Sequence, residues 1–189
     1  PAALDQHLRP TYGEPATIET LGGKSGAGVR RVHFAHASVI VKASASPNET
    51  RFYQAFAPLL RAHGIPLPGF EFSLSDETGY WLVLEDIPHP LPKEYWNGDR
   101  RLVAVLARLH SILLDNLPAV LVGYLPSWTD ELTEKALACF SAAQSAALRP
   151  LLAAAQANAA PLFRGETIIS ADPNPLNWGI RDDGSLVLF

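Results

Sequence analysis

The stretch VIVKASASPNETRFYQAF, residues 39–56, joins an apolar strand to an amphipathic helix and decides how the first half of the chain is interpreted. Residues 38–43 (SVIVKA) are β-branched and apolar enough to predict a strand. A helix is predicted over 48–63, with Asn48 as its candidate N-cap and Glu49 favourably placed at the positive helix N-terminus. Large apolar residues recur at helical spacing and give this helix one apolar face: Phe52, Phe56, Leu59 and Leu60.

Short strand candidates surround this stretch and make the N-terminal part of the chain rich in β-structure. They lie at residues 16–21, 29–35, 69–74 and 80–85, and a glycine-rich turn at 22–28 joins the first two. We therefore predict an N-terminal lobe, residues 1–86, in which one helix accompanies a sheet. Three prolines fall within residues 87–98, so this segment is predicted to be a hinge or linker.

The composition turns helical after this linker, and residues 99–189 are predicted to form a second, mostly helical lobe. Helices are predicted over 99–114, 129–145 and 147–160, followed by a strand at 166–171 and a hairpin at 178–189 that turns at 182–184. A β-rich block followed by a helical block indicates an α+β fold with two lobes.

Composition excludes several classes of function. The chain has 189 residues, 48% of them hydrophobic, which predicts a globular protein with a substantial core. The net charge of −4 and the absence of a basic cluster argue against nucleic-acid binding. A single cysteine, Cys139, excludes an internal disulfide, and we expect it to be a buried apolar residue in a cytoplasmic protein. The sequence contains no apolar stretch long enough to span a membrane and no secretory signal.

Three features of the N-terminal part are candidates for phosphate binding. In the glycine-rich turn, Gly23, Ser25 and Gly26 allow backbone N–H groups to approach a phosphate, although such turns are also common in plain hairpins. Lys42 at the end of its strand is suited to pair α- and β-phosphates, or simply to protect a strand edge. Glu49 is placed to hold the Lys42 ammonium group, and only that pairing lifts it above ordinary helix-dipole complementarity.

The loop ADPNPLN, residues 171–177, is the candidate catalytic segment. It places a carboxylate, Asp172, five residues before an amide, Asn177, between a predicted strand and a predicted hairpin. Phosphoryl transfer uses such a pair, because an Asp accepts or orients the acceptor hydroxyl and an Asn holds a magnesium ion. The alternative interpretation is a proline-rich turn that carries Asn and Asp as ordinary turn residues.

Taken together in this order, the features resemble the aminoglycoside phosphotransferase family, whose relatives include choline kinases and homoserine kinases. The resemblance rests on VIVKAS at 39–44, NETRFYQAF at 48–56, LVLED at 82–86, LARLHS at 106–111 and ADPNPLNWGIRDDGSLVLF at 171–189. It spans nearly the whole chain and implies a protein-kinase-like fold with two lobes.

The resemblance also implies roles for individual residues. Asp172 would be the catalytic base or hydroxyl-orienting group, and Asn177 would be a ligand of Mg²⁺. Lys42 would contact the α- and β-phosphates of ATP or GTP, with Glu49 orienting it. Residues 83–88, which include Glu85, would offer backbone groups to the adenine base. By the same resemblance, His110 is expected to be a packed structural residue.

The sequence departs from the family pattern at the candidate catalytic loop. The family usually has His-Gly before the catalytic Asp, where this chain has Ser170 and Ala171. It often has His two residues after that Asp, where this chain has Asn174. The family's second metal-binding Asp would be residue 190, so the resemblance implies that the chain is truncated just before it.

We therefore expect a small-molecule kinase that transfers the γ-phosphoryl group of ATP to a hydroxyl of a small, cationic or amino-bearing acceptor. Two alternatives stay open: a nucleotide-binding protein without catalytic activity, and an interaction module built on the same fold. No nucleic-acid or membrane partner is expected, and the sequence does not define the acceptor or the oligomeric state.

Overall fold

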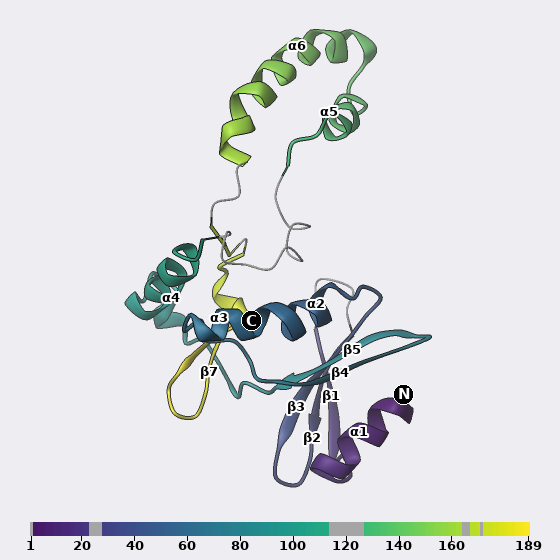
Figure 1. The fold of residues 1–189 in the computed structure, drawn as a ribbon, viewed down its shortest axis with the longest axis vertical. Coiled ribbons are helices and arrows are strands. Elements are labelled where there is room, and N and C mark those ends of the chain that lie inside the picture. The colour runs from purple at the N-terminus through teal and green to yellow at the C-terminus, as the bar shows by residue number, and fades with distance from the viewer. Residues whose placement is uncertain (1, 23–27, 114–126, 164–166, 171) are drawn as a thin grey trace. The chain divides into compact units, whose positions relative to one another are not determined.

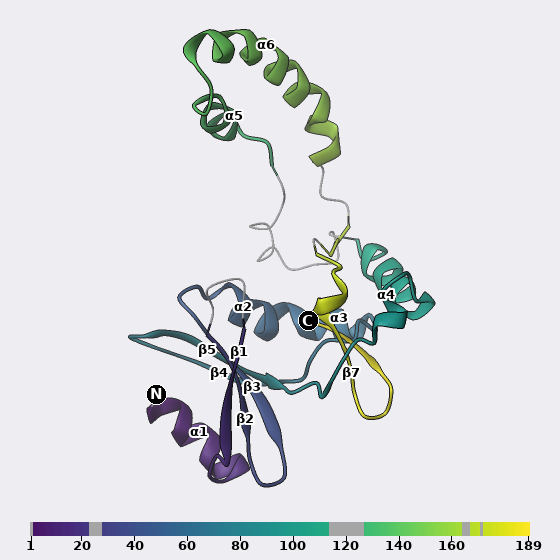
Figure 2. The same ribbon diagram turned by 180° about the vertical axis from the view of Figure 1, so that it is seen from behind.

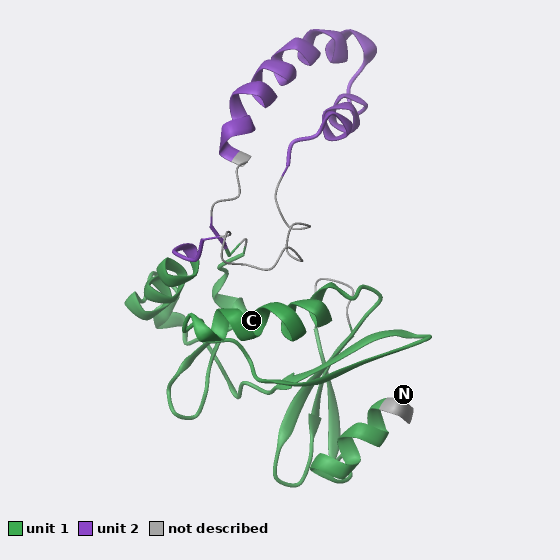
Figure 3. Ribbon diagram, in the orientation of Figure 1, with its two compact units in different colours: residues 1–109, 170–189 green, residues 110–169 purple. Residues whose placement is uncertain are grey.

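The computed structural model describes residues 2–22, 28–113, 127–163, 167–170 and 172–189 (Figure 1). The chain divides into two compact units, coloured separately in Figure 3. Unit 1 comprises residues 1–109 and 170–189, and unit 2 comprises residues 110–169. These units do not coincide with the two predicted lobes, since unit 1 contains residues of the N-terminal lobe and of the C-terminal lobe. The division into lobes on either side of residues 87–98 therefore stays a prediction.

Unit 1 is built on a five-stranded antiparallel sheet with the strand order β1-β2-β3-β5-β4. The strands are β1 (Thr17–Leu21), β2 (Gly28–His33), β3 (Ser38–Ser44), β4 (Phe70–Asp76) and β5 (Gly79–Glu85). Each overlaps a strand predicted from the sequence. In this order β3 is central, and its Lys42 lies opposite Val29 of β2 and Leu82 of β5.

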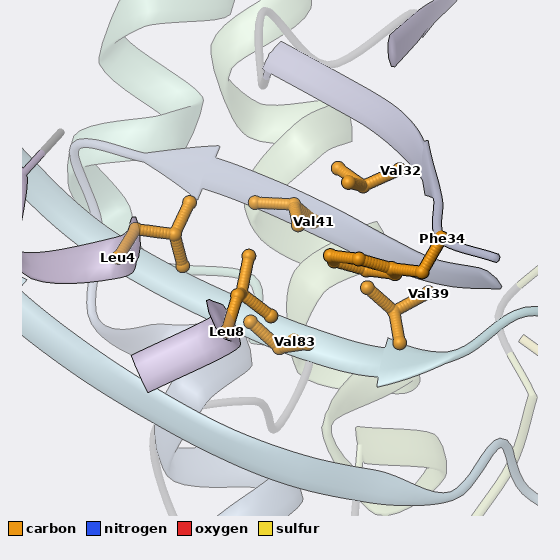
Figure 4. Packing of buried hydrophobic residues seen from close by; sticks show 7 residues of the cluster. All are labelled: Leu4, Leu8, Val32, Phe34, Val39, Val41 and Val83. Atoms are coloured by element: carbon orange, nitrogen blue, oxygen red, sulfur yellow. The ribbon is translucent and has the colours of Figure 1, made fainter. Parts of the chain in front are cut away.

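One face of this sheet is covered by α1 (Ala2–Tyr12), a helix that the sequence analysis did not predict. Figure 4 shows the packing of the core cluster, whose members come from α1 and from β2, β3, β5 and the turn after β2. The cluster consists of Leu4, Leu8, Val32, Phe34, Val39, Val41 and Val83. Because side chains alternate along a strand, Ile40 and Lys42 point to the opposite face.

The helical segment from Asn48 to Ala62 lies on that opposite face, as Figures 1 and 2 show from two sides. It consists of α2 (Asn48–Arg51), a π-helical turn η1 (Phe52–Phe56) and α3 (Ala57–Ala62). The π turn falls where Pro58 has no N–H to donate and its ring crowds the carbonyl of Gln54. The predicted N-cap is wrong by one residue, because Pro47 holds that position and Asn48 is already helical.

The C-terminal hairpin forms a second, three-stranded sheet in unit 1. Its strands are β6 (His89–Pro90), β7 (Trp178–Ile180) and β8 (Leu186–Leu188), in that order. The hairpin turns at the predicted position, where Gly184 adopts a φ of +81° that favours glycine. Trp178 and Val187 are fully buried and anchor the hairpin in the core of unit 1.

Two further helical elements follow β6 along the chain. These are the 3₁₀ turn η2 (Lys93–Tyr95) and α4 (Arg100–His110), which buries Leu102 and Leu109. The guanidinium of Arg108 donates to the carbonyl of Gly64 at 2.9 Å and so ties α4 to the end of α3. His110 is exposed, so the expectation that it is packed is wrong.

Unit 2 contains α5 (Asp130–Leu137), α6 (Ala142–Ala159) and the 3₁₀ turn η5 (Ala160–Phe163). The break between the helices lies earlier than predicted, because Ser141 and Gln144 form a capping box that starts α6. Cys139 lies in this break and is exposed, so its predicted burial is wrong. No described helix is long and apolar enough to cross a membrane.

The strand predicted at 166–171 is also wrong within the residues that the structure describes. An isolated antiparallel bridge joins Thr167 to Leu113, and the amide of Ile168 donates to the carbonyl of Ile112 at 3.3 Å. Ile168, Ile169 and Ser170 are otherwise irregular. Polar residues on both sides interrupt the short apolar run, which is too short to sustain a ladder.

Candidate functional site

The ammonium group of Lys42 forms an ion pair with the carboxylate of Glu49, through Nζ and Oε1. Lys42 extends from the central strand, and Glu49 lies in the first turn of α2 on the same face of the sheet. The two side chains are 27% and 36% exposed. A lysine held by a carboxylate but still reached by solvent is suited to receive a phosphate group.

The loop from Asp172 to Asn177 is shaped by its own polar side chains. The amide of Asn174 donates to Asp172 Oδ1 at 3.3 Å, and the Asn174 side chain accepts from the amide of Leu176 at 3.0 Å. The second of these bonds caps the 3₁₀ turn η6 (Pro175–Asn177). Asn174, which departs from the family pattern, therefore has a structural use here.

Asn177 closes this loop through its side chain and its backbone. Its Nδ2 donates to the backbone oxygen of Asp172 at 3.0 Å, and its backbone oxygen accepts from the amide of Phe189 at 2.8 Å. The side-chain nitrogen is therefore used within the loop, and the amide oxygen is the atom of this side chain that can act as a metal ligand. Asp172 itself is exposed and Asn177 half-buried.

Asn177 fits a magnesium ion only as part of a larger ligand set. Among the described residues no group of three His, Cys, Asp or Glu side chains could hold a metal ion. Magnesium usually keeps several waters and binds one or two protein oxygens together with substrate phosphates. A single amide oxygen from Asn177 matches that pattern.

Glu85, the predicted hinge residue, uses its carboxylate inside the protein. Arg181 donates to it through two nitrogens, Nε to Oε1 at 2.5 Å and Nη2 to Oε2 at 2.8 Å. The amide of Gly69 also donates to Oε2 at 2.7 Å. The Arg181 hydrogen bonds hold the pKa of Glu85 below its ordinary value, and partial burial opposes them. The amide of Glu85 in turn donates to the carbonyl of Gly69 at 2.9 Å, so both the carboxylate and the backbone N–H of Glu85 are used within the protein.

Asp86, within the predicted hinge, has a buried carboxylate whose role the sequence analysis missed. Its side chain is only 6% exposed, and Oδ2 accepts from Arg31 Nε at 2.8 Å and from Ser38 Oγ at 2.6 Å. Arg31 also pairs with Glu19 at 3.0 Å. Oδ1 of Asp86 is buried without a hydrogen-bond partner in the described part of the chain. This network joins the start of β3 to the residue after β5.

The structure thus assigns clear positions to some predicted site residues and not to others. Gly23, Ser25 and Gly26 lie outside the described residues. Lys42 and Glu49 are paired, and Asp172 and Asn177 share a loop. The roles of Arg181 and Asp86 were missed, although both lie in stretches that carry the resemblance, because their contacts are with residues distant in the sequence. All described site residues belong to unit 1.

No model of a known protein family matches the sequence, and no curated protein matches it. Solved structures do match the fold. A spectinomycin phosphotransferase crystallised with ADP and spectinomycin aligns with a TM-score of 0.62 and 14% identity, over 100% of this chain and 67% of its own. A choline kinase from Streptococcus pneumoniae aligns with a TM-score of 0.62 and 16% identity, over 99% of this chain and 66% of its own.

A third structure, an aminoglycoside-3'-phosphotransferase of type VIII, aligns with a TM-score of 0.53 and 22% identity, over 98% of this chain and 75% of its own. The choline kinase has also been crystallised with AMP. This chain spans about two-thirds of the length of the first two proteins. The α+β arrangement of an antiparallel sheet and helices described above is the one that these alignments share. The chain has the protein-kinase-like fold of the aminoglycoside phosphotransferases and choline kinases.

Proposed function

We propose that the protein is a nucleotide-dependent phosphotransferase that moves the γ-phosphoryl group of ATP or GTP to a hydroxyl of a small molecule. The observation that carries the proposal is the Lys42–Glu49 ion pair on the central strand of this fold. The same compact unit contains the loop with Asp172 and Asn177. A held lysine and an Asp–Asn loop are the two protein parts that phosphoryl transfer needs for charge and for positioning.

Each residue has a distinct role in this proposal. Lys42 pairs with the α- and β-phosphates, and Glu49 keeps the ammonium group pointed at them. The backbone of the hinge, residues 83–88, receives the base. Asp172 accepts or orients the proton of the acceptor hydroxyl, and Asn177 holds a magnesium ion through its amide oxygen. That ion, when bound, supplies charge neutralisation across the phosphates.

The acceptor class is proposed from the proteins of the same fold. One was crystallised with spectinomycin and another is a choline kinase, so both names point to small alcohols that carry cationic nitrogen. We propose an acceptor of this class, a small molecule with both a hydroxyl and an amino or ammonium group. A cytoplasmic location, where ATP is available, goes with the proposal.

The test begins with binding and continues with turnover. Calorimetry with ATP and GTP, with and without Mg²⁺, is expected to detect a nucleotide that binds more tightly when the metal is present. A screen of amino alcohols and aminoglycosides with radiolabelled γ-phosphate then identifies the acceptor, and Asp172→Asn is expected to abolish labelling while nucleotide binding stays. Magnesium-dependent binding with no labelled acceptor would favour the non-catalytic alternative, and absence of binding would overturn the proposal.

A further inference from the structure

The guanidinium group of Arg181 connects three separate segments of unit 1. It makes the two hydrogen bonds to Glu85 already described, and its Nη2 also donates to the carbonyl of Leu67 at 3.2 Å. Its Nη1 donates to Ser185 Oγ at 3.4 Å, across the turn of the C-terminal hairpin. One side chain thus joins the end of β5, the segment before β4 and the hairpin.

These segments carry opposite halves of the proposed site. The end of β5 leads into the hinge, and Leu82 of the same strand lies opposite Lys42 on β3. Arg181 directly follows β7, which directly follows Asn177. Lys42 on β3 and Asn177 before β7 are therefore connected through β5, the Glu85–Arg181 pair and β7.

The other hydrogen bonds described for the hairpin reach loops and the short strand β6. The amide of Leu188 donates to the carbonyl of Pro66 at 2.8 Å, and the amide of Leu91 donates to the carbonyl of Trp178 at 3.3 Å. The pairing of β7 with β6 involves residues 89–90. These contacts hold the hairpin in place, whereas the contact of Arg181 with Glu85 aligns it directly with the sheet that carries Lys42.

Two features make this contact directional. The guanidinium meets the carboxylate through two nitrogens, so both the distance and the angle between the groups are fixed. Arg181 and Glu85 are 30% and 29% exposed, so solvent screens the pair less than it screens a fully exposed one. A lysine at this position would keep the charge but lose the planar, two-bond geometry.

We infer that Arg181 is a positioning residue, which aligns the metal-binding loop with the nucleotide held by the sheet. The inference rests on the proposed function, since it assigns Lys42 and Asn177 to the same nucleotide. Arg181 touches neither nucleotide nor metal in this role. It acts by fixing the position of Asn177 before the nucleotide binds. Such preorganisation determines how much the metal ion contributes to nucleotide affinity.

The test compares nucleotide affinity with and without Mg²⁺ in the purified protein, using calorimetry with ATP. The quantity of interest is the gain in affinity that Mg²⁺ produces. Arg181→Met is expected to reduce this gain about tenfold, the lower end of the range for changes to groups that support metal ligands. Affinity without Mg²⁺ is expected to stay within about threefold of wild type, because Lys42 and its pairing with Glu49 are untouched. Arg181→Lys is expected to lose most of the gain as well.

Arg149→Met is the matched control. Arg149 makes a similar two-nitrogen pair with Glu134 in unit 2, including a 3.0 Å contact from Nη2 to Oε2. This variant is expected to keep the full gain, and a similar loss in it would overturn the inference, because the gain would then follow general stability.

The remaining outcomes separate the inference from the proposed function. Wild-type protein that binds no nucleotide, or gains nothing from Mg²⁺, overturns the proposed function and the role of Arg181 with it. A wild-type gain that persists in Arg181→Met overturns the role of Arg181 alone. If Arg181→Met does not fold, a full gain in folded Arg181→Lys leads to the same conclusion.

Discussion

At the scale of single residues, the ion pair of Lys42 with Glu49 joins strand β3 to helix α2 and presents a cation to the same face of the sheet. The lysine is paired in the protein alone, so a phosphate has to compete for it. Glu49 favours one position of the ammonium group, which orients it for a ligand. A phosphate carries more negative charge than one carboxylate, so we expect the phosphate to compete successfully with Glu49 for this group.

Replacing the lysine tests this expectation. Lys42→Ala is expected to weaken nucleotide binding about tenfold to a hundredfold, the range for loss of a hydrogen bond to a charged group. Glu49→Gln is expected to weaken it less, because the cation remains. Fluorescence titration with a labelled ATP analogue measures both. Lys135→Ala, which removes an exposed lysine paired with Glu131, is the control and should bind as wild type. Equal affinities of Lys42→Ala and this control would contradict the role of Lys42.

The Glu85–Arg181 pair leads to a prediction about pH. The pKa of Glu85 lies below its model-compound value of 4.5, chiefly because of the Arg181 hydrogen bonds. A carboxylate with a lowered pKa contributes stability above its unfolded pKa, and this contribution is lost as the pH falls through the folded pKa. The stability difference between wild type and Glu85→Gln is therefore expected to be largest near neutral pH and to shrink below about pH 4.5.

Thermal unfolding at pH 7, 5, 4 and 3 measures this difference. Glu77→Gln, a change at an exposed turn residue, serves as the control and should show no comparable trend. A difference between wild type and Glu85→Gln that grows toward acid pH would contradict the assignment, because the sign of the linkage would be reversed.

At the scale of elements, helix α1 packs on the five-stranded sheet and contributes to its hydrophobic core. Leu8 is 2% exposed and packs in the core cluster against residues of the central strands. Leu8→Ala is expected to lower the free energy of unfolding by about 2–4 kcal/mol, the usual cost of truncating a buried leucine. Denaturant titration measures the change. Ile18→Ala, at an exposed position of β1, is expected to cost much less. Equal costs would mean that α1 does not pack as described.

Periodicity explains which elements could be predicted from the sequence. The helix over 48–62 carries a clear apolar face, and the strands are separated by turns rich in glycine and polar residues, so these elements were found. The first helix was missed because it contains Pro10, which usually marks a helix end. The break between α5 and α6 was misplaced because an alanine-rich stretch has little apolar period, and the cap at Ser141 was overlooked.

The residues of the candidate site likewise fall into those that the sequence predicts and those that it does not. Lys42, Glu49, Asp172 and Asn177 were found because each pair lies within seven residues of sequence and follows a spacing tied to chemistry. The pair of Glu85 and Arg181 spans 96 residues, and nothing local marks Arg181 as different from a surface arginine. Contacts of this kind depend on how the hairpin packs against the sheet, which a single sequence does not specify.

At the scale of the whole molecule, every described site residue lies in unit 1, and unit 2 consists of α5, α6 and the segments around them. A ligand that binds only the folded protein stabilises most strongly the parts that it contacts or orders. Nucleotide binding should therefore change the two units unequally.

Hydrogen exchange followed by mass spectrometry tests this expectation. Addition of ATP with Mg²⁺ is expected to slow exchange about tenfold or more in peptides from β3, β5 and residues 172–177, the change that corresponds to about 1.4 kcal/mol of local stabilisation. Peptides from α5 and α6 are expected to change little. The same experiment on Lys42→Ala controls for nonspecific effects of nucleotide and should show little protection anywhere. Protection concentrated in α5 and α6 would place the nucleotide in unit 2, and the function proposed for Lys42 and the loop would then have to be abandoned.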